Sequence, residues 1–232
     1  MKTKLLLAAS AATVAAAAAT PALAGDTDKN WTVSLGAATD YRSKGTSKTM
    51  GEPYAYGSVE WRTEDEMFYV AAGAARVKQS FGAEIETEVR VGARPEVAGF
   101  EVALEAMYRY YPDADDGTDN EYWEFTGDVS RTVGPISGRL RVQYSPDNAG
   151  GSHAFTYYEA RGTYKISPKF KASAAVGRRE TEDSVDYTAW NAGITFKATD
   201  HIDLDLRWYD TDANSYGENY EEALVAGVAF KF

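Results

Sequence analysis

The sequence contains no cysteine and only two histidines, His153 and His201. A chain without cysteine has no disulfide, no thiolate nucleophile and no sulfur ligand for zinc. His153 lies in a long polar stretch and His201 beside a short turn, at opposite ends of the strand pattern described below. We therefore expect both histidines to be surface residues and not partners in one catalytic site.

Basic residues are outnumbered: 24 Lys and Arg stand against 35 Asp and Glu, which gives a net charge of −11. A chain that binds nucleic acid neutralises phosphates with clustered Lys and Arg, whereas this acidic chain would repel them. The composition therefore argues against nucleic acid as a partner.

Long apolar runs are confined to the first residues of the chain. Residues 1–24 contain Lys2 and Lys4, then a charge-free alanine-rich stretch, then Ala22-Leu23-Ala24, which are the three parts of a secretory signal peptide. We expect cleavage after Ala24, and subtracting the two lysines from 24 basic residues leaves 22 against 35 acidic ones, a net charge of −13. No later stretch has about eighteen successive apolar residues, so no transmembrane helix is expected.

The rest of the chain, residues 25–232, reads as one domain of alternating segments. In His201–Asp210, HIDLDLRWYD, every second residue is apolar and those between are polar or charged, the period of a β-strand with two different faces. Such a strand fits either a soluble core or a membrane barrel whose apolar face meets lipid. About twelve segments share the pattern: 31–40, 54–62, 67–77, 83–94, 100–111, 121–130, 136–144, 154–166, 169–178, 186–197, 201–210 and 220–232.

Two further patterns favour lipid over a soluble core. The connections alternate between short turns and longer loops such as 41–52 and 211–219, as in outer-membrane barrels. Aromatic residues on the apolar faces gather near strand ends, where two girdles would meet the bilayer interfaces. The residues expected to form these girdles are Trp31, Trp61, Phe100, Tyr108, Trp123, Tyr144, Trp190, Trp208, Phe230 and Phe232.

We therefore predict an all-β fold, a transmembrane antiparallel up-and-down β-barrel of about twelve strands that closes between Trp31 and Phe232. The expected location is the outer membrane of a Gram-negative bacterium, in contact with outer-membrane lipid and lipopolysaccharide. The last strand alternates to a terminal Phe232, which resembles the signal that the barrel-assembly machinery recognises.

Residues 34–61, SLGAATDYRSKGTSKTMGEPYAYGSVEW, resemble the opening signature of TorF-type porins. The matching residues are Asp40, Tyr41, Arg42, Gly45, Ser47 and Pro53, whereas Ser43 and Lys44 stand where that family usually has an aromatic residue. The resemblance implies an outer-membrane barrel with a pore, and it extends more loosely over the remaining strands.

The face opposite the apolar one is charged, and we expect it to line a lumen. The residues expected to line it are Glu84, Glu86, Glu88, Glu101, Glu105, Arg109, Glu124, Asp128, Arg139, Arg141, Arg161, Lys165, Lys171, Asp203, Asp205 and Arg207. Acidic residues prevail in segments 83–130 and basic ones in 136–178, which suggests an acidic wall facing a basic wall. Such a lumen favours passive diffusion of small hydrophilic solutes or ions.

Three alternatives stay open at this point. The charges could pair across a narrow barrel and plug it, leaving a structural or surface-interaction protein. Some barrels of this size are lipid-modifying enzymes, but the sequence shows no nucleophile and base together, and we expect no catalysis and no cofactor. Asp210, Asp212, Asn214 and Glu221 match part of a calcium-loop pattern, yet Ser215 replaces its turn glycine, so a solvated acidic loop is the better interpretation.

Overall fold

A computed structural model describes residues 30–79 and 81–232, so the expected signal peptide lies outside the described residues. Twelve long strands follow one another along the chain, each close to a segment predicted from the alternation. Their bounds are β1 (Trp31–Ala38), β4 (Tyr54–Arg62), β5 (Phe68–Arg76), β6 (Ile85–Ala93), β8 (Phe100–Tyr110), β9 (Glu121–Val133), β10 (Ile136–Ser145), β11 (Phe155–Lys165), β12 (Phe170–Thr181), β13 (Tyr187–Lys197), β14 (Ile202–Thr211) and β15 (Ala223–Lys231).

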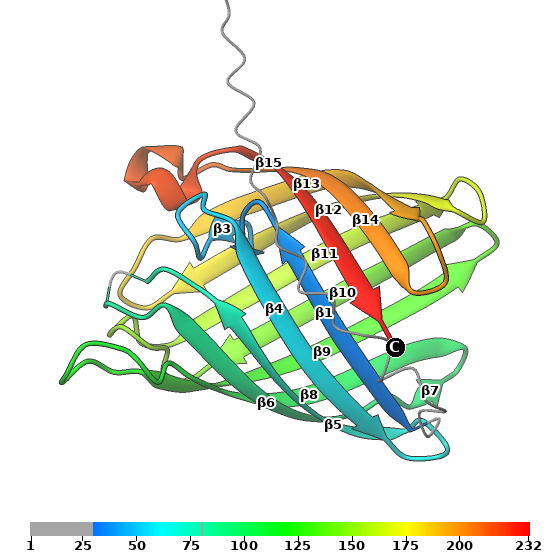
Figure 1. The fold of residues 1–232 in the computed structure, drawn as a ribbon, viewed down its shortest axis with the longest axis horizontal. Helices are drawn as coiled ribbons and strands as arrows, with labels where there is room; N and C mark the ends of the chain where they lie inside the picture. The colour runs from blue at the N-terminus through cyan, green and yellow to red at the C-terminus, as the bar shows by residue number, and fades with distance from the viewer. Residues whose placement is uncertain (1–29, 80) are drawn as a thin grey trace, which may run out of the picture.

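These strands form one closed antiparallel barrel (Figure 1). Each strand pairs with its neighbours along the chain, and β1 pairs with β15 to close the ring. At the closing seam Val33 and Phe232 exchange two backbone hydrogen bonds of 2.9 Å. The predicted twelve-stranded barrel and its closure near Trp31 and Phe232 are therefore confirmed, and each of the twelve described barrel strands pairs on both sides.

The two faces of each strand differ as the alternation predicts. On β14, Leu204, Leu206 and Trp208 are exposed on the outside, whereas Arg207 is 6% exposed on the inside. The same alternation places all ten expected girdle aromatics on the outer face, with Trp31, Phe100, Trp123, Tyr144, Trp208 and Phe232 among the exposed ones. An apolar outer surface around a polar interior is the arrangement that a bilayer stabilises.

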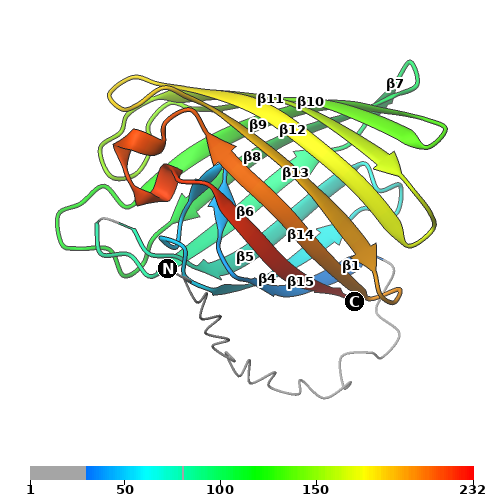
Figure 2. The same ribbon diagram turned by 90° about the horizontal axis from the view of Figure 1, so that it is seen from above.

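The two ends of the barrel also differ (Figure 2). Tight turns join the strands at one end, where the short strand β7 (Glu96–Val97) pairs with the start of β8. The longer loops lie at the other end and include two 3₁₀ turns, η2 (Asn214–Tyr216) and η3 (Glu218–Tyr220). Within the described ranges, no helix is long and apolar enough to cross a membrane.

One of the predicted long loops is folded into the barrel. Residues 40–52 include a small hairpin of β2 (Arg42–Ser43) and β3 (Thr46–Ser47), which pair with each other and with no strand of the barrel. Thr49 is fully buried and Ser47 is 7% exposed, so the loop turns inward at the long-loop end. We call residues 40–52 the inward hairpin, because polar contacts with the barrel wall hold it there.

Candidate functional site

The barrel interior gathers most of the charged residues that the sequence places in the lumen. Those that form ion pairs or side-chain hydrogen bonds well inside the barrel are Glu86, Glu88, Glu105, Arg109, Glu124, Asp128, Arg139, Arg141, Arg161, Asp205 and Arg207. Glu101, Lys165, Lys171 and Asp203 lie at the short-turn end of their strands. Glu84 precedes β6 and is exposed, so it lies apart from this network.

Arg109 of β8 forms the centre of the network near the long-loop end. Its guanidinium Nη2 lies 2.7 Å from Glu88, its Nε lies 3.7 Å from Glu86, and its Nη1 donates to the hydroxyl of Tyr122 at 2.6 Å. Glu86 and Arg109 are only 2% and 6% exposed. Charged groups this deeply buried are stable only when paired and hydrogen-bonded, and this network supplies both.

A second group of ion pairs joins the acidic and basic parts of the wall. Arg141 of β10 donates two hydrogen bonds to Asp128 of β9, of 2.7 and 2.6 Å. Arg139 and Arg161 share Glu159, at 2.5 and 3.3 Å. The acidic strands β6, β8 and β9 form one arc of the ring and the basic strands β10–β12 form the next. The two arcs meet where β9 pairs with β10. The expectation of two walls facing each other is corrected here, because sequential pairing puts consecutive strands side by side.

A third group lies on β13 and β14. Arg207 donates to the side chains of Asn191 and Ser173, both at 2.9 Å, and pairs with Asp205 at 3.2 Å. Thr195 donates to Asp205 at 2.8 Å. Every inner-wall charge of this group therefore has a polar partner from a neighbouring strand.

The segment that resembles the TorF signature forms the inward hairpin. The carboxylate of Asp40 accepts hydrogen bonds from Ser47 at 2.5 Å and Thr49 at 2.9 Å, and it also pairs with Arg42. Gly45 has a φ of +92°, and a Cβ there would lie 2.2 Å from the Cβ of Ala189 on β13. Only glycine tolerates both this backbone conformation and this close approach. The motif residues therefore act together to fold the loop inward.

Two lysines fasten the hairpin to distant strands. Lys44 Nζ lies 2.6 Å from Glu124 of β9, and Lys48 Nζ lies 2.5 Å from Glu86 of β6. From β1, which precedes the hairpin, β9 is five strands away in one direction and seven in the other. The hairpin therefore reaches across the lumen and narrows it at the long-loop end.

Burial changes the protonation of these hairpin groups. Desolvation lowers the pKa of the Lys44 ammonium to about 8, with Arg109 and Arg179 contributing in the same direction and Glu124 opposing it. Desolvation also raises the pKa of the Tyr41 hydroxyl well above its ordinary value, as does Glu86, to which this hydroxyl donates at 2.7 Å. Tyr41 therefore stays a neutral hydrogen-bond donor, whereas Lys44 titrates at a moderately alkaline pH.

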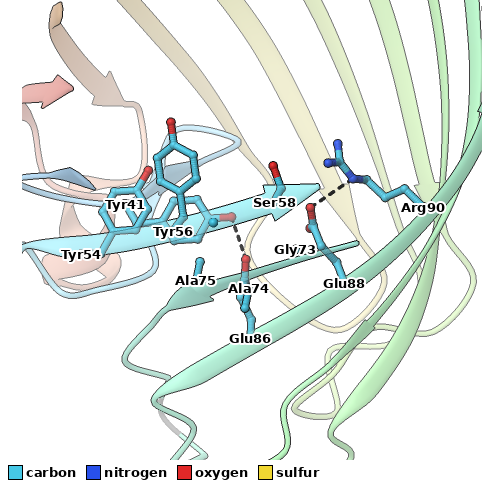
Figure 3. Close-up of a pocket in the computed structure, with 11 residues that line it drawn as sticks. Tyr41, Tyr54, Tyr56, Ser58, Gly73, Ala74, Ala75, Glu86, Glu88 and Arg90 are labelled. Carbon is cyan, nitrogen blue, oxygen red and sulfur yellow. Dashed lines mark hydrogen bonds and ion pairs between the residues drawn. The ribbon is translucent and has the colours of Figure 1, made fainter. Parts of the chain in front are cut away.

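The described part of the lumen keeps open space below the hairpin, in at least two places. Figure 3 shows the first, a cavity of about 280 Å³ between the rings of Tyr41, Tyr54 and Tyr56 and the side chains of Glu88 and Arg90. The rings of Tyr41 and Tyr54 stack with centroids 4.6 Å apart. A second space of about 260 Å³ lies beyond Tyr54 and Tyr56, lined also by Asp40, Asp203, Asp205 and Tyr209. Both combine polar groups with tyrosine rings, so they suit hydrated polar solutes better than apolar ones.

The lysines and tyrosines of this constriction are not among the residues that the sequence predicts to line the lumen. Lys44, Lys48 and Tyr41 lie in the segment 41–52 that the pattern predicts as a long loop, and a loop has no periodicity that would show where its side chains point. Tyr54 and Tyr56 alternate with outward-facing residues on β4, so the two-residue period of the strand predicts that both point inward. The signal that could have exposed the hairpin is the run of Gly, Ser and Thr around two lysines within 43–49.

The two histidines and the residues of the calcium-loop pattern do not come together in one place in the described structure. His153 lies 3.4 Å from Asp183 in an exposed loop, whereas His201 Nδ1 lies 2.8 Å from the Lys231 carbonyl oxygen at the opposite end. Asp212 accepts a hydrogen bond from the Thr188 backbone, and the Glu221 carbonyl oxygen accepts one from Arg42. Over residues 30–79 and 81–232, no group of three or more His, Cys, Asp or Glu is arranged to hold a metal ion.

The architecture and its interior define a transmembrane β-barrel with a charged, partly filled lumen. The chain matches the family described as "Bacterial protein of unknown function (Gcw_chp)" over residues 22–229, and it belongs to that family. No curated protein sequence matches the chain.

Solved structures share the fold at low sequence identity. The chain is similar to a KdgM porin, with a TM-score of 0.60 and 9% identity over 87% of this chain and 99% of that one. A KdgM porin in complex with disordered oligogalacturonate gives 0.61 and 9% over the same shares, and a NanC porin gives 0.60 and 11% over 86% and 100%. These likenesses show that the chain has the fold of twelve-stranded porins.

Proposed function

We propose that this protein is an outer-membrane porin through which small hydrophilic solutes or ions diffuse passively. The observation that carries this proposal is a closed barrel with an apolar outer face and a charged inner face around unfilled space. A bilayer excludes polar solutes, whereas a polar lumen provides hydrogen-bond partners along the way. The similar fold of the KdgM and NanC porins supports the same function.

The proposal includes the surroundings of the barrel. Exposed aromatics such as Trp31 and Trp123 would lie at the two membrane interfaces, with outer-membrane lipid and lipopolysaccharide around them. Phe232, which pairs with Val33 at the closing seam, would be read by the barrel-assembly machinery. The TorF-type assignment is part of this proposal, and the role of its motif residues in the inward hairpin supports it.

The test is single-channel recording of the refolded protein in planar bilayers under a salt gradient. Discrete, reproducible current steps are expected, and the reversal potential gives the ion preference. A barrel that runs as folded on unheated gels but carries no current would contradict an open pore.

A second candidate, a plugged barrel, is favoured by the ion pairs that hold the inward hairpin across the mouth. The doubly substituted Lys44→Gln/Lys48→Gln chain discriminates between the two. If the natural chain is silent and the double variant conducts, the hairpin is a plug. If both conduct, the hairpin is a constriction within an open pore.

A further inference from the structure

A third cavity lies at the long-loop end, directly against the inward hairpin. Its volume is about 150 Å³, the space of about five water molecules at ~30 Å³ each. Hydroxyl and amide groups, among them those of Ser43, Gln79 and Asn148, line it together with five aromatic rings: Phe81, Tyr111, Tyr122, Phe155 and Tyr220. A site of this size has room for a small organic molecule and not for a polymer.

Three cations line the same cavity: Lys44, Lys48 and Arg179. Two of them are neutralised, since Lys44 pairs with Glu124 and Lys48 with Glu86. Arg179 of β12 differs, because its guanidinium carbon lies 4.5 Å from the centroid of the Phe155 ring and its buried Nε has no hydrogen-bond partner among the described residues.

The preceding residue on β12 is an arginine that does have carboxylate partners. Arg178, on the opposite face of β12, pairs with Asp186 at 3.5 Å and Glu180 at 4.0 Å. Arg179 is absent from the ion pairs formed by residues 30–79 and 81–232. A partly buried guanidinium that forms no ion pair and lies beside open polar space offers a site for an anion. The positive charge of Arg179 also acts on the neighbouring hairpin, because Arg179 and Arg109 both lower the pKa of the Lys44 ammonium.

We propose that this mouth cavity binds a small hydroxycarboxylate, with the Arg179 guanidinium holding the carboxylate. Arginine presents a planar pair of N–H donors that matches a carboxylate, and the hydroxyl and amide groups around it suit the hydroxyl of the guest. Phe155 holds the guanidinium from the side through its ring face. The site deepens the proposed porin function by naming a solute class that would pause at the mouth before entering the lumen.

The experiment uses the refolded full barrel in detergent micelles and isothermal titration with lactate, with lactamide as the uncharged probe of the same shape. Lactate is expected to bind, and lactamide to bind at least about tenfold more weakly, since a hydrogen bond to a charged group contributes about 1.5–3 kcal/mol. Arg179→Gln is expected to weaken lactate binding by a similar factor. Arg178→Gln is the matched control on the outer side of the same strand and should bind lactate like the natural chain.

Each other outcome overturns the site. Equal binding of lactate and lactamide, no binding by the natural chain, or undiminished binding by a folded Arg179→Gln chain would each contradict it. The lactate and lactamide comparison on the unaltered chain decides the question even if Arg179→Gln fails to fold. The titration measures binding and not conductance. A failure of the proposed porin function in the channel recording and a failure of the proposed binding site in the titration can therefore be told apart.

Discussion

Lys44 and Glu124 lie 80 residues apart in the chain and form an ion pair of 2.6 Å inside the barrel mouth. Lys44 belongs to the inward hairpin, whereas Glu124 belongs to the wall on the far side, with only 4% of its surface exposed. This contact holds the hairpin inside the barrel, where it forms part of the lumen. The conductance, the ion selectivity and the pH dependence of stability are each expected to depend on this ion pair.

Removing the lysine anchors should open the mouth. In Lys44→Gln/Lys48→Gln, two ion pairs are lost and Glu124 and Glu86 keep their charge, so we expect a larger single-channel conductance and a stronger preference for cations. Planar-bilayer recordings measure both quantities. Lys78→Gln is the control, because its partner Glu52 is the partly exposed last residue of the hairpin, and losing this pair leaves both ion pairs across the lumen in place. An unchanged conductance in the double variant would show that the hairpin does not limit flow.

Rising pH should shift ion selectivity through Lys44. Its pKa of about 8 means that the ammonium loses its charge between about pH 7 and 9. The groups that face it, Glu124, Arg109 and Arg179, are of types that ordinarily do not titrate in this window. We expect the reversal potential to move toward cation preference over this range, and Lys44→Gln to lack the shift. A shift of equal size in Lys44→Gln would assign it to another group.

The same group should make folding pH-dependent in a defined direction. The folded-state pKa of Lys44, about 8, lies below its ordinary value of 10.5. Between these values the unfolded chain binds the proton more tightly, so the contribution of Lys44 to the free energy of unfolding rises with pH. Urea unfolding in lipid vesicles should therefore show a smaller gain between about pH 8 and 10 for Lys44→Gln than for the natural chain. An equal gain in both would contradict the lowered pKa.

The close contact of Gly45 predicts an unequal pair of glycine substitutions. Gly45→Ala places a methyl group against Ala189, whereas Gly51→Ala places one where no heavy atom lies within 4 Å. Both have positive φ, at +92° and +74°, so both carry a backbone penalty of about 1 kcal/mol. Gly45→Ala should destabilise the barrel by a further ~1–3 kcal/mol, because the hairpin or β13 must move. Urea unfolding compares the two, and equal values would contradict the packed hairpin.

The outer face should tolerate charge poorly once the barrel is in lipid. Leu206 lies on the outer face of β14 and is 51% exposed there. Leu206→Arg should lower the free energy of unfolding in vesicles by ~2–4 kcal/mol, as arginine does near the bilayer midplane. Ser58→Arg, on the inner wall beside the cavity of Figure 3, is the control and should change stability by less than ~1 kcal/mol while altering ion selectivity. Equal effects at the two positions would argue against a lipid-facing outer surface.

The strands, their number and their two faces can be predicted from the sequence alone. A period of two is a local property of the backbone, so segments such as His201–Asp210 show which residues point inward without any knowledge of their neighbours. Paired neighbours also follow from chain order in an up-and-down barrel, which is why the ring closes at Val33 and Phe232 as the terminal segments indicate.

The contents of the lumen, in contrast, become visible only in the folded barrel. The alternation says that Glu86 and Glu124 point inward, but not that Lys48 and Lys44 reach them from a distant loop. It equally cannot say that Arg179 forms no ion pair with any residue that the structure describes. These contacts join residues far apart in the chain, and their distances exist only after closure fixes the width of the barrel. The physical reason is that strand periodicity is set within a few residues, whereas pairing across a lumen is set by the whole ring.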